Sequence, residues 1–277
     1  MIRSVFLLLF STCFCNLLHA QYYYKDIVSN KELLAEMSQY REQKIHVVKV
    51  KSFEDDGSPS EGFFCEKKIS RDFRTVETMN RSYVSAASLL TSYFDRKGLL
   101  EKTVDSSEIT VRSSVYHYNE AGQLTSVLSS IRSSDDDFTN EILEEHIYRY
   151  NEKAVLKQMV KVKNNTDSTV IDFSADEKNN ITIEKDTKSG AKYYYYYDGK
   201  NRLTDVAHAN DFQHRITPDY SFEYNGQGNM IQMTNTEEGA KSYYFIWKYT
   251  YDNGLRIMEK CYNKEKRLLG TIQYEYK

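Results

Sequence analysis

Proline and cysteine are both scarce in this sequence. Its 277 residues include 2 prolines, Pro59 and Pro218, and 4 cysteines. Two of the cysteines lie in the apolar N-terminal segment, so only Cys65 and Cys261 remain for the folded part. That number excludes a disulfide-dense scaffold. Two interpretations of the remaining pair stay open: a disulfide that joins the N-terminal and C-terminal regions, or two buried thiols that never meet.

Long apolar runs and blocks of one charge are also missing. After residue 20, no apolar run approaches the roughly 20 residues that a membrane-spanning helix needs. The formal net charge is −3, and lysine and arginine do not gather into a basic patch, which excludes the usual electrostatic footprint of nucleic-acid binding. We therefore expect no transmembrane segment in the mature chain and no nucleic-acid partner.

Motifs that carry chemistry are absent as well. There is no nucleophile elbow, no zinc-binding H-E-x-x-H pair and no phosphate-binding glycine loop. His208 and His214 are six residues apart without a cysteine or acidic cluster at a fixed offset, which does not define a metal site. We predict no catalytic residue, no cofactor and no metal. Because carboxylates are plentiful, a glycan-active enzyme stays open as a minor alternative.

Residues 1–20 are typical of a secretory signal peptide. Arg3 supplies the positive start, residues 5–10 begin an apolar core, and Ala20 completes a cleavage site before Gln21. We therefore predict export, to the periplasm or outside the cell. The alternative is a membrane-anchored lipoprotein modified at Cys13 or Cys15, which is less favoured because the residues before those cysteines are poor ones for lipidation.

The chain is rich in tyrosine, and much of it follows one repeated pattern. In its clearest copy, Tyr116 and Tyr118 precede Asn119, Gly122 and Leu124. Counted from the second tyrosine, the pattern has an aromatic at −2, Asn or Asp at +1, Gly at +4 and an aliphatic residue at +6. The copies are anchored at Phe94, Tyr118, Tyr150, Phe173, Tyr197, Tyr224, Tyr251 and Tyr276. A recurring spacing of this size marks a repeat architecture.

Each repeat is expected to form a β-hairpin. Asn or Asp followed three residues later by Gly is typical of a type I turn, with the Gly at positive φ. In that register Tyr118 should pair with Leu124. Ala154 and Leu255 occupy the Gly position in two copies and should strain those turns or change their type.

Residues at +9 suggest that both faces of the sheet are covered. Side chains alternate between the two faces of a strand, so residues at odd offsets should lie on the face opposite the tyrosines. The residues at −1 on that face are polar, but those at +9 are apolar: Val127, Met159, Val206 and Met233. A capping box that starts at Ser29 predicts one short helix over about 30–41. The predicted fold is all-β: an antiparallel meander of repeated hairpins that forms a curled or partly closed sheet, with one short N-terminal helix.

The pattern resembles the YD repeat of the RHS family, in which Tyr-Asp precedes a turn with Gly and a following Leu. The resemblance covers 92–277, and we expect 21–91, the helix and leading strands, to form one continuous domain with it. Large RHS proteins coil such hairpins into a shell around a self-cleaved toxin. The Asp-Pro self-cleavage motif is absent here, because Ser58 and Thr217 precede the two prolines. The resemblance therefore implies the hairpin architecture but not the toxin mechanism.

Five consecutive tyrosines, Tyr193 to Tyr197, are the one local anomaly. Tyr194 and Tyr196 fall on the face where the other repeats have polar residues. Adjacent exposed tyrosines would form a binding platform for a sugar or a peptide. The simpler alternative is that Tyr194 pairs with Val206 within a second buried patch.

Together these features favour a secreted, non-enzymatic β-repeat protein of the bacterial envelope that binds a glycan or a protein through its sheet face. An envelope carrier that holds an apolar ligand in a curled-sheet concavity is the second hypothesis. A glycan-active enzyme on the same scaffold is the third.

Overall fold

A computed structural model describes residues 21–83, 85–135, 141–210, 215–237 and 243–277. The predicted signal peptide, with Cys13 and Cys15, lies outside the described residues. The described chain starts with a helical segment, a π-helical stretch over Tyr23–Val28 followed by helix α1 over Ser29–Glu42. Within the described part, none of the helices is long and apolar enough to cross a membrane.

Strands make up most of the rest. They are β1 (Val47–Glu54), β2 (Phe64–Ile69), β3 (Thr75–Arg81), β4 (Ser88–Phe94), β5 (Leu100–Ser107), β6 (Thr110–Tyr118), β7 (Leu124–Ser133), β8 (Glu141–Tyr150), β9 (Leu156–Lys163), β10 (Asp167–Ala175), β11 (Ile181–Asp186), β12 (Lys192–Tyr197), β13 (Leu203–Asn210), β14 (Arg215–Tyr224), β15 (Met230–Glu237), β16 (Tyr243–Asp252), β17 (Leu255–Tyr262) and β18 (Leu268–Tyr276). In the described part of the chain all of them belong to one 18-stranded sheet.

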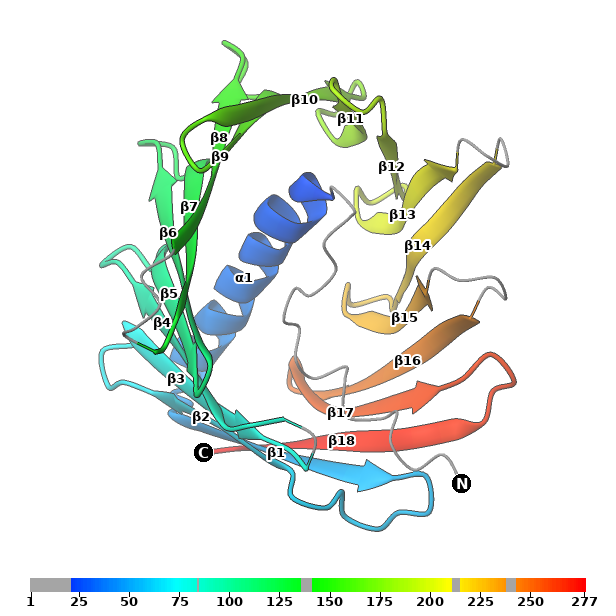
Figure 1. The fold of residues 1–277 in the computed structure, drawn as a ribbon. Coiled ribbons are helices and arrows are strands. Elements are labelled where there is room, and N and C mark those ends of the chain that lie inside the picture. Colours follow the sequence, from blue (N-terminus) through cyan, green and yellow to red (C-terminus); the bar gives the residue numbers. More distant parts are fainter. Residues whose placement is uncertain (1–20, 84, 136–140, 211–214, 238–242) are drawn as a thin grey trace.

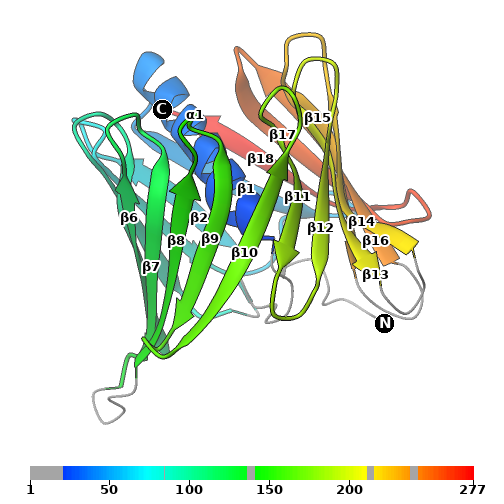
Figure 2. The ribbon, with the colours of Figure 1, turned by 90° about the horizontal axis from the view of Figure 1, so that it is seen from above.

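The sheet is closed. Each strand pairs antiparallel with the next one along the chain, and β1 pairs with β18, with Val48 opposite Tyr276 and Val50 opposite Tyr274. Figures 1 and 2 show the resulting barrel, with α1 inside it. The prediction of a curled or partly closed sheet was therefore wrong. Pairing of the two terminal strands satisfies backbone groups that an open sheet would leave at its edges.

The interpretation of the +9 residues was also wrong, and a β-bulge explains why. Tyr118 pairs with Leu124 as expected, but the register then shifts by one residue, so that Tyr116 pairs with Val127. The same shift places Met159 opposite Tyr148. The tyrosines and the +9 residues consequently share the inner face of the barrel, and the hairpins have one covered face rather than two.

The turns follow the predicted geometry more widely than expected. Gly122 has φ 76°, and Ala154 adopts the same left-handed conformation with φ 60° without a change of turn. In both turns the +4 amide donates to the carbonyl oxygen at +1. The turn before Leu255 is different: it is shorter, and Asn253 and Gly254 have the positive φ values.

Hydroxyl groups of the repeat tyrosines join neighbouring repeats. Tyr150 donates to the carbonyl oxygen of Leu124 at 2.8 Å, and Leu124 is the +6 residue of the preceding repeat. Tyr224 donates in the same way to Leu203 at 2.7 Å. The repeated tyrosine therefore stabilises the barrel in two ways. Its ring packs inside the barrel, and its hydroxyl donates a hydrogen bond to a backbone carbonyl oxygen of the preceding repeat.

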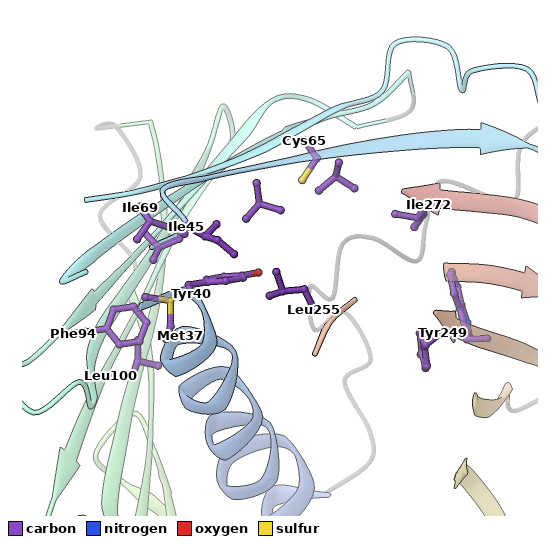
Figure 3. Packing of buried hydrophobic residues seen from close by; sticks show 14 of the residues in the cluster. Met37, Tyr40, Ile45, Cys65, Ile69, Phe94, Leu100, Tyr249, Leu255 and Ile272 are labelled. Atoms are coloured by element: carbon purple, nitrogen blue, oxygen red, sulfur yellow. The ribbon is translucent and has the colours of Figure 1, made fainter. Parts of the chain in front are cut away.

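The helical segment, formed by the π-helical stretch and α1, lies inside the barrel and contributes to two buried clusters. Met37 and Tyr40 pack with residues of β1, β4, β5 and β17 (Figure 3). Ile27 packs with Tyr148, Tyr195 and other inner residues of β7 to β14. The predicted capping box does not start the helix, because Ser29 has helical dihedral angles and the helical segment already runs through Tyr23–Val28.

The outer wall carries polar residues near the turns, as the −1 residues of the repeats indicated, together with exposed apolar ones such as Phe64, Met79 and Tyr93. Charged side chains are exposed there on strands around the barrel: Lys51, Arg149, Asp172, Lys185, Glu223, Lys248, Lys260 and Glu275.

Ala154→Gly should stabilise the protein by up to about 1 kcal/mol, because glycine removes the cost of a left-handed Ala and offsets part of that gain by its freedom in the unfolded chain. Urea denaturation measures the change. Ala121→Gly in a sibling turn is the control and should be slightly destabilising, since Ala121 is not among the positive-φ residues. Destabilisation by Ala154→Gly would contradict the turn assignment.

Candidate functional site

The predicted ligand residues Tyr194 and Tyr196 lie on the outer wall, on β12. Tyr193 and Tyr195 alternate with them and are buried on the inner face, whereas Tyr196 is 45% exposed and Tyr194 is half-buried. Tyr194 pairs with Ala207 rather than with Val206, which instead lies opposite Tyr195. The two tyrosines are therefore outside both buried clusters.

The outer surface around them combines apolar and polar groups. Tyr194 lies between Ile183 on β11 and Ala207 on β13. Tyr196 lies opposite Asp205, whose carboxylate accepts a hydrogen bond from Ser221 at 2.7 Å. Two neighbouring rings with a carboxylate beside them could stack against a flat ligand and accept its hydrogen bonds.

The hydroxyl groups separate these tyrosines from the inner ones on the same strand. Tyr195 donates to Glu184 at 2.7 Å, and Tyr197 donates to the carbonyl oxygen of Ile181 at 2.9 Å. Among the interactions of the described residues, the hydroxyls of Tyr194 and Tyr196 make no hydrogen bond. The hydroxyls of Tyr195 and Tyr197 therefore stabilise the fold, whereas those of Tyr194 and Tyr196 are available to a ligand.

A second group of polar residues is buried inside the barrel, around the start of the helical segment. The Glu184 side chain is fully buried, and its carboxylate accepts the backbone N–H groups of Tyr22 at 3.1 Å and Tyr23 at 3.0 Å. These N–H groups have no partner within a helix, and the helix dipole favours a negative charge beside them. Burial nevertheless raises the pKa of Glu184 to about 7, because it disfavours the charged form.

Asp26 anchors the same segment to β8. Its carboxylate lies 2.5 Å from Nδ1 of His146 and accepts a hydrogen bond from Tyr148 at 2.5 Å. Nε2 of His146 lies 2.9 Å from Glu144. Burial alone would lower the pKa of His146, but the two carboxylates outweigh it and raise that pKa to about 9. At neutral pH the imidazolium therefore lies between two carboxylates.

Further inner contacts fix the helical segment to strands around the ring. Gln21 donates to Asp219 on β14 at 2.7 Å, and Lys161 on β9 donates to the Tyr22 hydroxyl at 2.7 Å. Near the other end, Glu36 forms an ion pair with Lys67 on β2 at 2.9 Å. These groups are already engaged with one another, so the arrangement suits holding a segment in place better than turning over a substrate.

No sequence pattern pointed to Glu184, Asp26 or His146. They come from distant parts of the chain, and only the closed barrel brings them together. A charged residue on the inner face of a strand is no specific signal, since Glu259 occupies such a position as well.

The two mature cysteines are both buried, and in the structure both are free thiols. Burial raises the pKa of Cys65 to about 11 and that of Cys261 to about 12, which keeps both as unreactive thiols. Among the described residues, no group of three or more His, Cys, Asp or Glu side chains is arranged to hold a metal ion.

No family model matches the chain, and a search of curated proteins found no match. Among solved structures, similarity is found to a porin-like protein from Bacteroides uniformis, with 10% identity, 84% of this chain and 98% of that chain covered, and a TM-score of 0.37. A complex described as TcdB2-TccC3-Cdc42 is similar over 78% of this chain with 10% identity and a TM-score of 0.30. The TccC3-containing Photorhabdus luminescens Tc holotoxin pore is similar over 86%, with 10% identity and a TM-score of 0.30.

The chain spans about 16% of the matched chain in the first of these complexes and 17% of the matched chain in the second. Similarities at this level of identity and TM-score do not define a family or a function.

Glu184 predicts a pH dependence of stability. Its pKa in the folded protein, about 7, is above its unfolded value of 4.5. The associated stability is therefore fully present below pH 4.5 and is lost as the pH rises through 7. By linkage the loss is on the order of 3 kcal/mol for Glu184 alone.

Urea denaturation of the natural protein and of Glu184→Gln at pH 5 and pH 8 isolates this contribution. We expect the natural protein to lose stability relative to the variant between the two values, because glutamine cannot ionise. His146 titrates equally in both proteins and cancels. An unchanged difference at the two pH values would show that Glu184 does not titrate in this range.

Proposed function

We propose that the protein is an exported, non-enzymatic binding protein of the bacterial envelope that holds a glycan on the outer wall of its barrel, at Tyr194 and Tyr196. The observation that carries the proposal is the contrast within β12. The hydroxyls of Tyr195 and Tyr197 are used by the fold, whereas those of Tyr194 and Tyr196, on the outer wall, make no hydrogen bond among the described residues. Neighbouring surface rings whose hydroxyls have no structural partner, here the exposed Tyr196 and the half-buried Tyr194, are typical of a recognition surface.

Polar neighbours favour a glycan over an apolar ligand. Asp205 lies opposite Tyr196 on the adjacent strand β13, Ser221 lies opposite Asp205 one strand further on, and Lys185 is exposed on β11. Sugar rings present an apolar face to an aromatic ring and hydroxyls around their edge. A protein partner is the second candidate for the same wall. The predicted signal peptide supports export of the protein from the cytoplasm.

The carrier hypothesis is less well supported. A carrier needs a lined cavity, and the interior is crossed by α1 and its contacts. Two hollows of the described chain lie elsewhere: one on the outer wall of β2 to β4, lined by Phe64, Met79 and Leu89 among others, and one at the β1–β2 connection, lined by Phe53, Pro59 and Phe63 among others. Neither is lined by a residue of the helical segment.

The enzyme hypothesis is also less well supported. Its best candidates, Glu184 and His146, have the shifted pKa values that active sites often have. Both groups are occupied by the chain itself, Glu184 by backbone N–H groups and His146 by Asp26 and Glu144. Structural networks shift pKa values in the same way.

Replacing both Tyr194 and Tyr196 with Ser tests the proposal. A glycan array identifies a bound glycan for the natural protein, and isothermal titration then compares the variants. We expect the double variant to lose at least about tenfold in affinity, equivalent to about 1.4 kcal/mol. The melting temperature should fall by only a few degrees, because both rings lie outside the two buried clusters.

Tyr93→Ser is the matched control, since Tyr93 is also exposed on the outer wall, at 39%, but lies on β4. Binding should survive this change. Unchanged binding by the double variant, or a natural protein that binds no glycan on the array, would refute the glycan site. A collapsed melting temperature would show that the two rings belong to the core.

A further inference from the structure

Among the described residues, the ladder between β11 and β12, called the seam below, is the shortest in the barrel. Its register consists of Ile183 with Tyr194, Glu184 with Tyr193, and Lys185 with Lys192. Neighbouring seams are longer: β10 pairs with β11 through five residue pairs, and β12 with β13 also through five. A ladder of three residue pairs provides the fewest backbone hydrogen bonds between two strands, so we expect local opening to cost least there.

The start of the helical segment spans this seam from inside. Glu184 is on β11, and its carboxylate accepts the hydroxyl of Tyr195, which is on β12. The same carboxylate accepts the N–H groups of Tyr22 and Tyr23. The Tyr23 ring packs edge-on against Tyr195, with ring centroids 5.1 Å apart, and against Phe173 on β10 at 6.4 Å.

We propose that residues 21–26 act as a latch that holds the β11–β12 seam closed, and that the barrel opens laterally at this seam when the latch is released. Glu184 is the positioning residue of the latch, because one buried carboxylate joins β11, β12 and the helical segment. Release would give the interior an exit through the wall without unfolding of the remaining strands.

The latch also contacts strands farther from the seam, on both sides of it. Gln21 reaches Asp219 on β14, and the Tyr24 ring lies over Tyr220 and Phe222 of the same strand, with centroids 5.1 Å and 5.8 Å away. On the other side, Asp26 holds His146 and Tyr148 of β8. The segment therefore connects β8 with β14 across the seam, in addition to the ladder itself.

Hydrogen–deuterium exchange of the full chain tests this inference without any ligand. Glu184→Ala removes the shared acceptor and should speed amide exchange in Ile181–Asp186 and Lys192–Tyr197 by about tenfold or more relative to β3 to β9. Glu259→Ala is the matched control. Glu259 is another buried inner carboxylate, and it accepts a tyrosine hydroxyl from the next strand, that of Tyr274 at 2.6 Å, but it is not bonded to the helical segment.

Tyr195→Phe is a milder second variant, which removes only the hydroxyl that crosses the seam. Its control is Tyr224→Phe, which removes a comparable hydroxyl from β14. We expect faster exchange at the seam in both latch variants and in neither control. Exchange at the seam as slow as in the natural protein, or an equal increase around the whole ring, would overturn the proposal.

Discussion

A ring of many strands encloses more space than its own side chains can fill, and the rest of this structure depends on that constraint. Barrels of about eight strands are filled by inward side chains, whereas those with 16–18 leave a channel. The sheet formed by the described residues has 18 strands. The chain meets the constraint by placing aromatic rings along the inner wall and a helix between them.

Filling the interior with a helix creates a second problem, because the start of a helix exposes N–H groups that need partners. At an exposed helix start, water would accept these hydrogen bonds. Here the buried carboxylate of Glu184 accepts them instead. The shifted pKa of that group is the electrostatic consequence. The number of strands therefore affects the pKa of Glu184 indirectly: the wide barrel contains a helical segment, and the N–H groups at the start of that segment require a buried acceptor.

Much of the hairpin structure could be predicted from the sequence. The pairing of Tyr118 with Leu124, the polar residues at −1 and the turn at Gly122 all depend on local spacing, which the repeat displays directly. Closure could not be predicted, because it depends on the pairing of β1 with β18 at opposite ends of the chain. The bulge misled the interpretation of Val127, since one extra residue reverses which face a side chain occupies.

The same distinction between predictable and unpredictable features applies to the candidate site. Tyr194 and Tyr196 were visible as a departure from a repeated pattern, and their role as ligand residues stays a prediction. The buried network around Glu184 was not visible, because no local pattern relates Tyr22 to β11. The helical segment was recognised, but its place inside a barrel follows only from closure.

The position of the helical segment can be tested by nuclear Overhauser measurements on the aromatic rings. The account predicts cross-peaks from Tyr22 to His146 on β8, with ring centroids 4.8 Å apart, and from Tyr24 to Tyr220 on β14, at 5.1 Å. Two residues so close in sequence can contact strands so far apart in the ring only from inside it. Absence of both contacts in the folded protein would contradict an occupied barrel.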